Sequence, residues 1–421
     1  MVETRILFPV NSQSLLTNPM RQQQKGDSRF SRTSAASAIR TKTTQTRREV
    51  VGPKLLGVAC GLVLAGMLVA GLWPFHSPRN QVAWVAGGNG LHFGRYGTIL
   101  SSAEFKPHDV PADTPCSLEI WFEPANPWPS RTLFSFYAPP NNRQLSLQQS
   151  NGYLALRSDT RETRYRTLTT ALDIEELFRQ RMPSFVTVTS TGAQTSVYID
   201  GALARAATNF PLSSRDFAGE LVIANLPKQE SSWSGLLRGL AFYDEALSPA
   251  QVVHHYETWT KNGRPDVSGN EQAVAVYLFD ERAGRVIHNQ VSSGANLYIP
   301  ERFMVLDQAF LRPFWEEYYP RWSYWKDVVL YNIVGFIPFG FLFCAYYSLG
   351  GRLKRPALVT ILLGFTVSLT IECLQALLPT RDSGTTDLIT NTLGTCLGVW
   401  IYRLNIWRAQ WARIWAHFAG S

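Results

Sequence analysis

The sequence has few charged residues and lacks the signature motifs of several common enzyme classes. Charged residues make up 17% of its 421 positions and hydrophobic residues 45%, whereas soluble domains carry about 25% charged residues. The motifs G-x-S-x-G, H-E-x-x-H and G-x-x-x-x-G-K-[ST] do not occur. Their absence argues against a serine hydrolase, a zinc protease and a P-loop nucleotidase. The low charge directs attention to membrane segments.

Cysteine is also scarce, and histidine is missing from the long apolar runs. Of the five cysteines only Cys116 lies outside an apolar run, so no disulfide is expected in the middle of the chain. Without histidine, a zinc centre among the apolar runs would lack its usual ligands. We therefore expect no catalytic residue, no metal and no cofactor.

Positive charge is abundant near the N-terminus. Residues 1–54 hold ten Lys and Arg against three acidic residues, so most of the net charge of +8 lies there. Residues 1–52 are rich in Ser, Thr, Gln and Arg and poor in aromatics, which predicts a disordered tail. The positive charge of this segment is better explained by membrane topology than by binding to a polyanion. We therefore expect no nucleic acid partner.

An uncharged apolar run, Leu55–Phe75, follows the basic tail and is long enough to cross a bilayer. Because Lys and Arg precede it and few follow, the positive-inside rule places the N-terminus in the cytoplasm. A cleaved signal peptide is the alternative interpretation. The long basic segment and the Trp73-Pro74 exit favour an uncleaved anchor helix over residues 53–75.

Residues 81–290 show short alternating runs separated by Gly, Pro, Asn and Asp, which is the pattern of an all-β sandwich. Leu118, Ile120 and Phe122 share one face of a predicted strand, with polar residues and Trp on the other. The dipeptide Asp200-Gly201 suits a type I′ hairpin turn. Ser248 followed by Pro249 predicts the start of a helix. The number of short strands favours a jelly roll.

The stretch WSGLLRGLAFYDEALSPAQVVHHY, residues 233–256, resembles the closing strand and short helix of concanavalin A-like, laminin-G-type domains. The resemblance implies a lectin-like fold that often binds glycans and sometimes uses calcium. The residues themselves predict no calcium site, because the acidic residues at turns are isolated. His254 and His255 are adjacent in the predicted helix, so they point to different faces and do not form a metal pair.

Three further apolar runs occupy the last quarter of the chain, at Val328–Leu349, Ala357–Leu378 and Leu388–Tyr402. With the anchor they predict an α-helical bundle of four spans, whose membrane domain covers residues 327–403. The basic loop at 350–356 belongs in the cytoplasm, and the link at 379–387 outside. This topology makes the protein multi-pass, with both termini in the cytoplasm and the sandwich on the periplasmic or extracellular side.

Two aromatic segments flank this domain. Residues 296–326 mix Trp, Tyr, Phe and Arg, which suits the headgroup zone of a bilayer. Residues 404–421 place tryptophans four positions apart, which predicts an amphipathic helix at the cytoplasmic surface. Both segments are therefore expected to contact membrane lipid.

Six polar residues lie unexpectedly within or beside these runs: Asn332, Glu372, Gln375, Arg381, Asp387 and Asn391. At a rise of 1.5 Å per residue, Asn332, Glu372 and Asn391 lie on three different helices at about 6 to 9 Å below the outer boundary of the membrane. Charged groups at this depth usually face a bundle interior or a wet cavity. We expect a polar pocket open to the outside, and the alternative is a hydrogen-bonded clamp between helices. Gly394 and Gly398 form a G-x-x-x-G pair that favours close helix packing.

The ordered set NIVGFIPFGFLF (332–343), IECLQ (371–375), Arg381, DLITNTLGT (387–395) and Gly398 resembles the VanZ-like family of bacterial membrane proteins. One named member of that family is associated with resistance to teicoplanin. The resemblance implies an integral membrane protein of the bacterial cell envelope and does not imply a reaction. The preceding sandwich departs from a minimal VanZ-like protein.

These observations predict a bacterial inner-membrane protein that binds an envelope glycan or a lipid-linked saccharide. In that hypothesis Arg381 binds an anionic group, Glu372 and Asp387 orient it, and the three amides donate hydrogen bonds. One alternative is a membrane enzyme with Glu372 as general base. The other is a non-catalytic scaffold for envelope or polysaccharide assembly.

Overall fold

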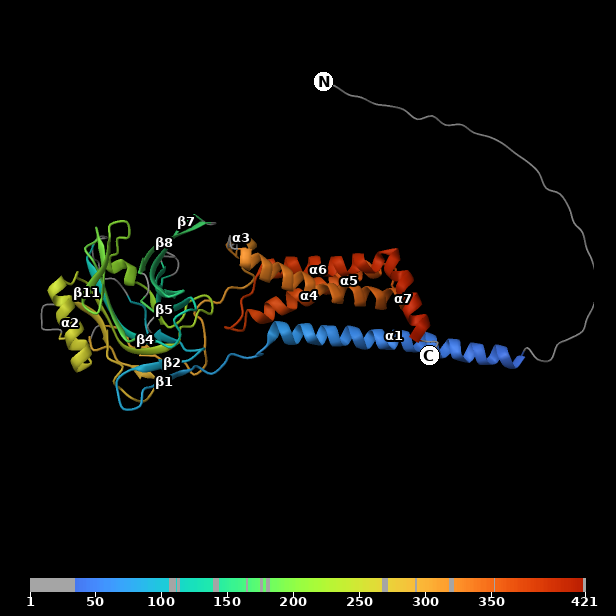
Figure 1. Ribbon diagram of the computed structural model, residues 1–421, viewed down its shortest axis with the longest axis horizontal. Helices are drawn as coiled ribbons and strands as arrows, with labels where there is room; N and C mark the ends of the chain where they lie inside the picture. Colours follow the sequence, from blue (N-terminus) through green and yellow to red (C-terminus); the bar gives the residue numbers. More distant parts are fainter. Residues whose placement is uncertain are drawn as a thin grey trace, which may run out of the picture. The chain divides into compact units, whose positions relative to one another are not determined.

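The computed structural model describes residues 35–105, 111, 114–138, 144–163, 166–174, 177–178, 182–266, 272–291, 294–317, 322–351 and 353–418 (Figure 1). The chain divides between residues 54 and 55, and the unit that begins at residue 55 holds the sandwich and the C-terminal helices. The first helix, α1, is Ala35–Leu72. Residues 35–52 are therefore helical, although we expected a disordered tail there, and residues 1–34 lie outside the described part. Extending a formed helix needs no new nucleus, which explains helix in so polar a segment.

The middle of the chain folds into two antiparallel sheets, each of eight strands within the described ranges. Sheet 1 has the order β1-β2-β13-β4-β9-β10-β11, and β14 also pairs with β13. Its strands are β1 Val82–Trp84, β2 Leu91–Phe93, β4 Cys116–Pro124, β9 Ser184–Ser190, β10 Thr195–Ile199, β11 Ala202–Ala207, β13 Gly235–Tyr243 and β14 Ala273–Tyr277.

Sheet 2 has the order β15-β16-β3-β12-β5-β6-β7-β8. Its strands are β3 Ile99–Ser101, β5 Arg131–Tyr137, β6 Gln144–Ser150, β7 Tyr153–Thr163, β8 Arg166–Ile174, β12 Glu220–Ile223, β15 Val286–Ile287 and β16 Leu297–Tyr298, and a short 3-10 helix, η1 Ser214–Phe217, precedes β12. Neighbouring strands are often distant in sequence, as in β2-β13-β4, so the sandwich is a jelly roll and not a meander.

The core lies between the two sheets. Leu118, Ile120 and Phe122 of β4 are buried, as their alternation predicted, and pack with residues of sheet 2. Phe242 of β13 meets Phe134 and Phe136 of β5, with ring centroids 5.8 and 5.1 Å apart. Such edge-to-face aromatic pairs add to the burial of apolar area that stabilises a two-layer fold.

The predicted local signals occur where expected. Asp200 and Gly201 have φ of 50° and 80° and join β10 to β11, as a type I′ turn requires. Helix α2, Pro249–Asn262, begins after Ser248, whose hydroxyl accepts from the Gln251 N–H. A second core cluster packs α2 against sheet 1.

The sandwich extends past the predicted boundary at residue 290. Strand β16 pairs with β3, although residues 296–326 were expected to lie at the membrane surface. The described remainder of that segment forms a loop, the short helix α3 at Phe314–Glu317 and the beginning of α4 at Trp322. Aromatic content alone did not distinguish a strand of the sheet from an interfacial segment.

The C-terminal region contains helices α4 Trp322–Leu349, α5 Pro356–Gln375, α6 Thr385–Arg403 and α7 Asn405–Phe418. Helices α4, α5 and α6 pack against one another (Figure 1). Three described helical stretches are long and apolar enough to cross a membrane, at Lys54–Leu72, Leu330–Leu349 and Pro356–Gln375. We expected four. Helix α6 falls short of that hydropathy because its buried face carries Asn391 and threonines.

Glycines bring α6 very close to its neighbours. A Cβ added at Gly394 would lie 2.3 Å from the Ile333 carbonyl oxygen, and one at Gly398 would lie 2.2 Å from that of Ile337. A Cβ at Gly340 of α4 would lie 2.2 Å from the Thr395 carbonyl oxygen. The predicted G-x-x-x-G face of α6 is therefore the face that meets the backbone of α4.

Candidate functional site

The predicted polar residues of the membrane domain gather along α6. Asn332 on α4 donates to the Asp387 Oδ1 at 2.8 Å and to the Thr390 Oγ1 at 3.2 Å. Asn391 donates to the Ser368 Oγ of α5 at 3.0 Å. Helix α6 is thus joined by side-chain hydrogen bonds to both neighbouring helices.

Glu372 accepts a hydrogen bond from the backbone at the N-terminus of α6. It is 1% exposed, and its Oε2 accepts from the Gly384 N–H at 2.8 Å. Gly384 is the N-cap of α6 and has no side chain of its own to bond the free N–H groups. A carboxylate here also complements the positive end of the helix dipole.

Gln375 and Arg381 contact the C-terminal end of α1. Gln375 donates to the Gly71 carbonyl at 2.9 Å. Arg381 donates through Nε and Nη2 to the Trp73 carbonyl, at 3.0 and 2.6 Å, and through Nη2 to the Ala70 carbonyl at 3.4 Å. These bonds satisfy carbonyls that a helix end leaves without intrahelical partners.

The structure therefore brings Asn332 and Asp387 into direct contact, whereas Glu372, Gln375 and Arg381 bond to backbone at helix ends. Two buried amide oxygens, Gln375 Oε1 and Asn391 Oδ1, have no hydrogen-bond partner among the described residues. The ligand-binding role of the six residues stays a prediction. The contacts of these residues match the alternative interpretation, which is a hydrogen-bonded clamp between helices.

The loop after β16 makes contacts that the sequence did not reveal. The Gln308 Nε2 donates to the carbonyls of Gln375, Leu378 and Arg381 at 3.1, 2.5 and 3.1 Å. Next to it, Asp307 accepts from the Tyr137 hydroxyl at 2.6 Å. The hydrogen bond from Tyr137, followed by nearby Lys228, lowers the pKa of Asp307 against the opposing effect of burial.

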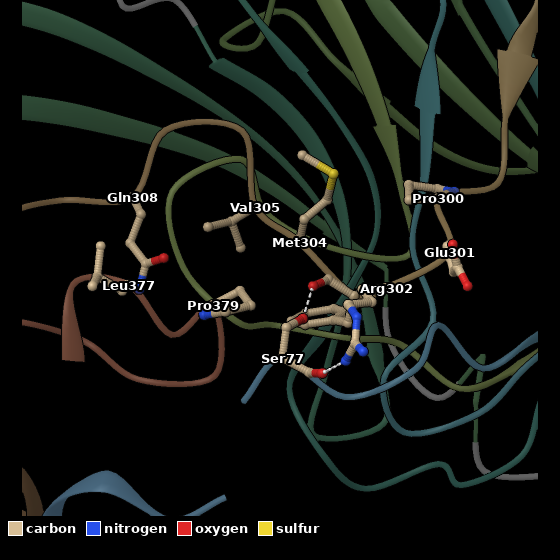
Figure 2. A pocket seen from close by; sticks show the side chains of 10 residues that line it. Ser77, Pro300, Glu301, Arg302, Met304, Val305, Gln308, Leu377 and Pro379 are labelled. Atoms are coloured by element: carbon tan, nitrogen blue, oxygen red, sulfur yellow. Dashed lines mark hydrogen bonds between the residues drawn. The ribbon is translucent and has the colours of Figure 1, made fainter. Parts of the chain in front are cut away.

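A hollow of about 470 Å³ lies beside this loop (Figure 2). Figure 2 shows Arg302 among the lining residues, where its Nη1 donates to the Ser77 carbonyl at 2.9 Å. Six of its ten lining residues are apolar, among them Met304, Val305 and Leu377. It offers few convergent polar groups for recognising a ligand.

A fully buried carboxylate, Glu119, lies between sheet 1 and α2. Its Oε2 accepts from the Tyr243 hydroxyl at 2.9 Å and the Trp259 Nε1 at 3.0 Å, and its Oε1 lies 2.9 Å from the His255 Nδ1. All four side chains are 0% exposed. Buried without water access, this group fastens α2 to the sheet and cannot meet a ligand.

A second hollow, of about 360 Å³, opens on the sandwich and is lined by polar residues. We call it the polar hollow, and its lining residues are Ser150, Asn151, Tyr153, Arg157, Asp173 and Arg205. They come from β6, β7, β8, β11 and the β6–β7 turn, where Asn151 has a φ of 51°. Sequence reasoning missed this group, because its members lie on four strands and follow no common motif.

Its geometry suits recognition of a polar ligand. The Tyr153 side chain is 37% exposed, so part of its ring is available as an apolar surface beside hydroxyl, amide and charged groups. Strand pairing sets Tyr153 opposite Ser150, and Ala155 opposite Asp173. Arg157 lies four residues after Tyr153 on β7, so the two side chains are on the same face of the strand.

Two antiparallel sheets with a closing helix, together with apolar helices, define a membrane protein that carries a lectin-like domain. Residues 97–253 match the family model of the concanavalin A-like lectin/glucanases superfamily. Residues 273–408 match the VanZ/LLP1 family model. The chain therefore contains a concanavalin A-like domain followed by a VanZ-like region, which confirms both resemblances and their order.

Solved structures include similar proteins at low identity. The CBM40 of Ruminococcus gnavus IT-sialidase bound to α2,3 sialyllactose has 14% identity and a TM-score of 0.30, covering 39% of this chain and 95% of its own. A heptameric SAP-like pentraxin from Limulus polyphemus has 17% identity and a TM-score of 0.29, covering 54% and 95%. No curated protein matches the chain significantly. The family matches carry the assignment, since the TM-scores are below 0.5.

Proposed function

We propose that this protein binds a glycan through the polar hollow of its concanavalin A-like domain and holds that domain at a membrane. The hollow is the observation that carries the proposal. It combines an exposed tyrosine ring with an amide, a hydroxyl, a carboxylate and two guanidinium groups. Sugars present apolar C–H faces and many hydroxyls, which such a mixture of groups complements.

The charge pattern supports one orientation. The basic tail and the loop at 350–356 favour the cytoplasm, so the sandwich lies on the periplasmic or extracellular side of a bacterial inner membrane. The glycans within reach there are cell-envelope polymers and saccharides carried on lipids. We propose one of these as the natural ligand.

For the six polar residues of the membrane domain, the contacts support a structural role first. Each of them hydrogen-bonds another helix or a helix end, and interhelical bonds of this kind hold a bundle together. A lipid headgroup pocket is the second proposal for the same residues. The unpartnered oxygens of Gln375 and Asn391, buried among the described residues, favour it, because a bound polar group would satisfy them.

The test is equilibrium binding of a panel of envelope-derived glycans to the full chain in lipid nanodiscs. Tyr153→Ala is expected to weaken binding at least tenfold, because it removes the apolar surface of the hollow. Tyr298→Ala is the matched control. Tyr298 is 36% exposed and lies on β16, at the other end of sheet 2. Equal binding by both variants and the unaltered protein would exclude the polar hollow as the site.

A further inference from the structure

We infer that the polar hollow selects a saccharide bearing an anionic group, either a carboxylate or a phosphate. This inference rests on the proposed glycan binding and adds the chemical class of the sugar. It is carried by the two arginines of the hollow and by the hydrogen-bond state of each.

The charges in the hollow favour an anion. Arg157 and Arg205 are opposed by a single acidic residue, Asp173, which leaves an excess of positive charge among its six lining residues. Register places Asp173 opposite Ala155, so Asp173 is a diagonal neighbour of Arg157 on the same face of sheet 2. The carboxylate of Asp173 remains suited to accept from sugar hydroxyls.

The side chain of Arg205 is held in place by a hydrogen bond to a backbone carbonyl. Its Nη1 donates to the main-chain carbonyl of Asp173, which joins β11 of sheet 1 to β8 of sheet 2. This bond fixes the plane of the guanidinium group while leaving other N–H groups to bind an oxyanion. A pre-positioned guanidinium loses less entropy on binding and presents paired donors to a carboxylate or phosphate.

Arg157 has a donor in need of a partner. Its Nε is buried, and among the described residues it has no hydrogen-bond acceptor. A buried N–H of a cation is rarely left unpaired in a folded protein. Arg157 also lines the hollow, so an anionic oxygen bound there would lie near both guanidinium groups.

Two matched pairs of probes separate charge from sugar recognition, using the full chain in nanodiscs of zwitterionic lipid. The first pair is a galacturonic acid trisaccharide and its methyl ester, which differ only in the anionic groups. The second is mannose 6-phosphate and mannose. We expect at least tenfold tighter binding of the charged member in one pair, and a loss of that preference as salt is added.

Arg157→Gln is expected to abolish the preference for the charged probe and to leave the neutral probe unaffected, and Arg205→Gln provides a second variant. Arg131→Gln is the control, because Arg131 lies on β5 of the same sheet and donates to the Ser130 carbonyl. Equal affinity for charged and neutral probes would overturn the inference while leaving glycan binding in place. Absence of binding by every probe, together with the envelope panel, would overturn both.

Discussion

Alanine at Gly398 is expected to separate α6 from α4 and to destabilise the helix bundle. A Cβ there would lie 2.2 Å from the Ile337 carbonyl oxygen and 2.7 Å from the Phe341 nitrogen. Both atoms belong to the backbone, so no side-chain rotation relieves the overlap. The helices must move apart by on the order of 1 Å to restore ordinary contact distances.

The size of the effect follows from two opposing contributions. Overpacking costs about 1 to 3 kcal/mol, and a clash with backbone belongs at the upper end. Replacing Gly by Ala in a helix returns about 1 kcal/mol through helix propensity. We expect a net loss of about 2 kcal/mol in the free energy of unfolding.

The assay is unfolding in mixed detergent micelles, followed by far-UV circular dichroism. Gly335→Ala in α4 is the control, because a Cβ at that position meets no atom within 4 Å. That variant is expected to be neutral or more stable by up to about 1 kcal/mol. The close packing of α4 on α6 would be refuted if Gly398→Ala were as stable as Gly335→Ala.

Three further predictions concern single carboxylates. Glu372→Leu should lower bundle stability by about 1 to 2 kcal/mol because it removes the cap on the Gly384 N–H, whereas Glu372→Gln keeps an acceptor and should cost less; the same unfolding assay compares them. Glu119→Leu should destabilise the sandwich by about 3 kcal/mol or more, because three buried donors lose their acceptor at about 1 to 3 kcal/mol each; faster hydrogen exchange in α2 would report this. The Tyr137 bond lowers the pKa of Asp307, so its stabilising effect is present above the unfolded pKa of about 3.9 and lost as pH falls through the folded value; Asp307→Asn should flatten that acid dependence in thermal unfolding, and an unchanged pH profile would contradict it.

Local sequence signals identified the sandwich class and several of its parts. The alternation of Leu118, Ile120 and Phe122 identified a core strand, and Asp200-Gly201 and Ser248-Pro249 identified a turn and a helix start. Each of these signals acts over a few residues, within the range where backbone preference and solvent exposure decide the structure. The family resemblances added the order of the two regions.

Contacts between distant segments could not be predicted in the same way. Alternation placed Glu119 on the solvent side of β4, yet it is buried beneath α2, whose His255 and Trp259 lie far along the chain. The sequence grouped Gln375 and Arg381 with the other polar residues of the predicted pocket. Their partners at the end of α1 depend on how separate helices pack, which periodicity does not encode.

The polar hollow illustrates the same limit. Tyr153, Arg157 and Asp173 lie on neighbouring strands of sheet 2, and Arg205 lies on an edge strand of the other sheet. Only the pairing of β7 with β8 and the bond from Arg205 to β8 bring them to one place. No spacing in the sequence could have grouped these residues.

Glycan binding at the polar hollow is tested most directly by hydrogen–deuterium exchange of the full chain in nanodiscs, with and without the tightest-binding glycan of the envelope panel. The account predicts slower exchange confined to residues 150–157, the end of β8 near Asp173, and β11 near Arg205. Protection elsewhere on the sandwich or in the helices, with no change in these three segments, would contradict it.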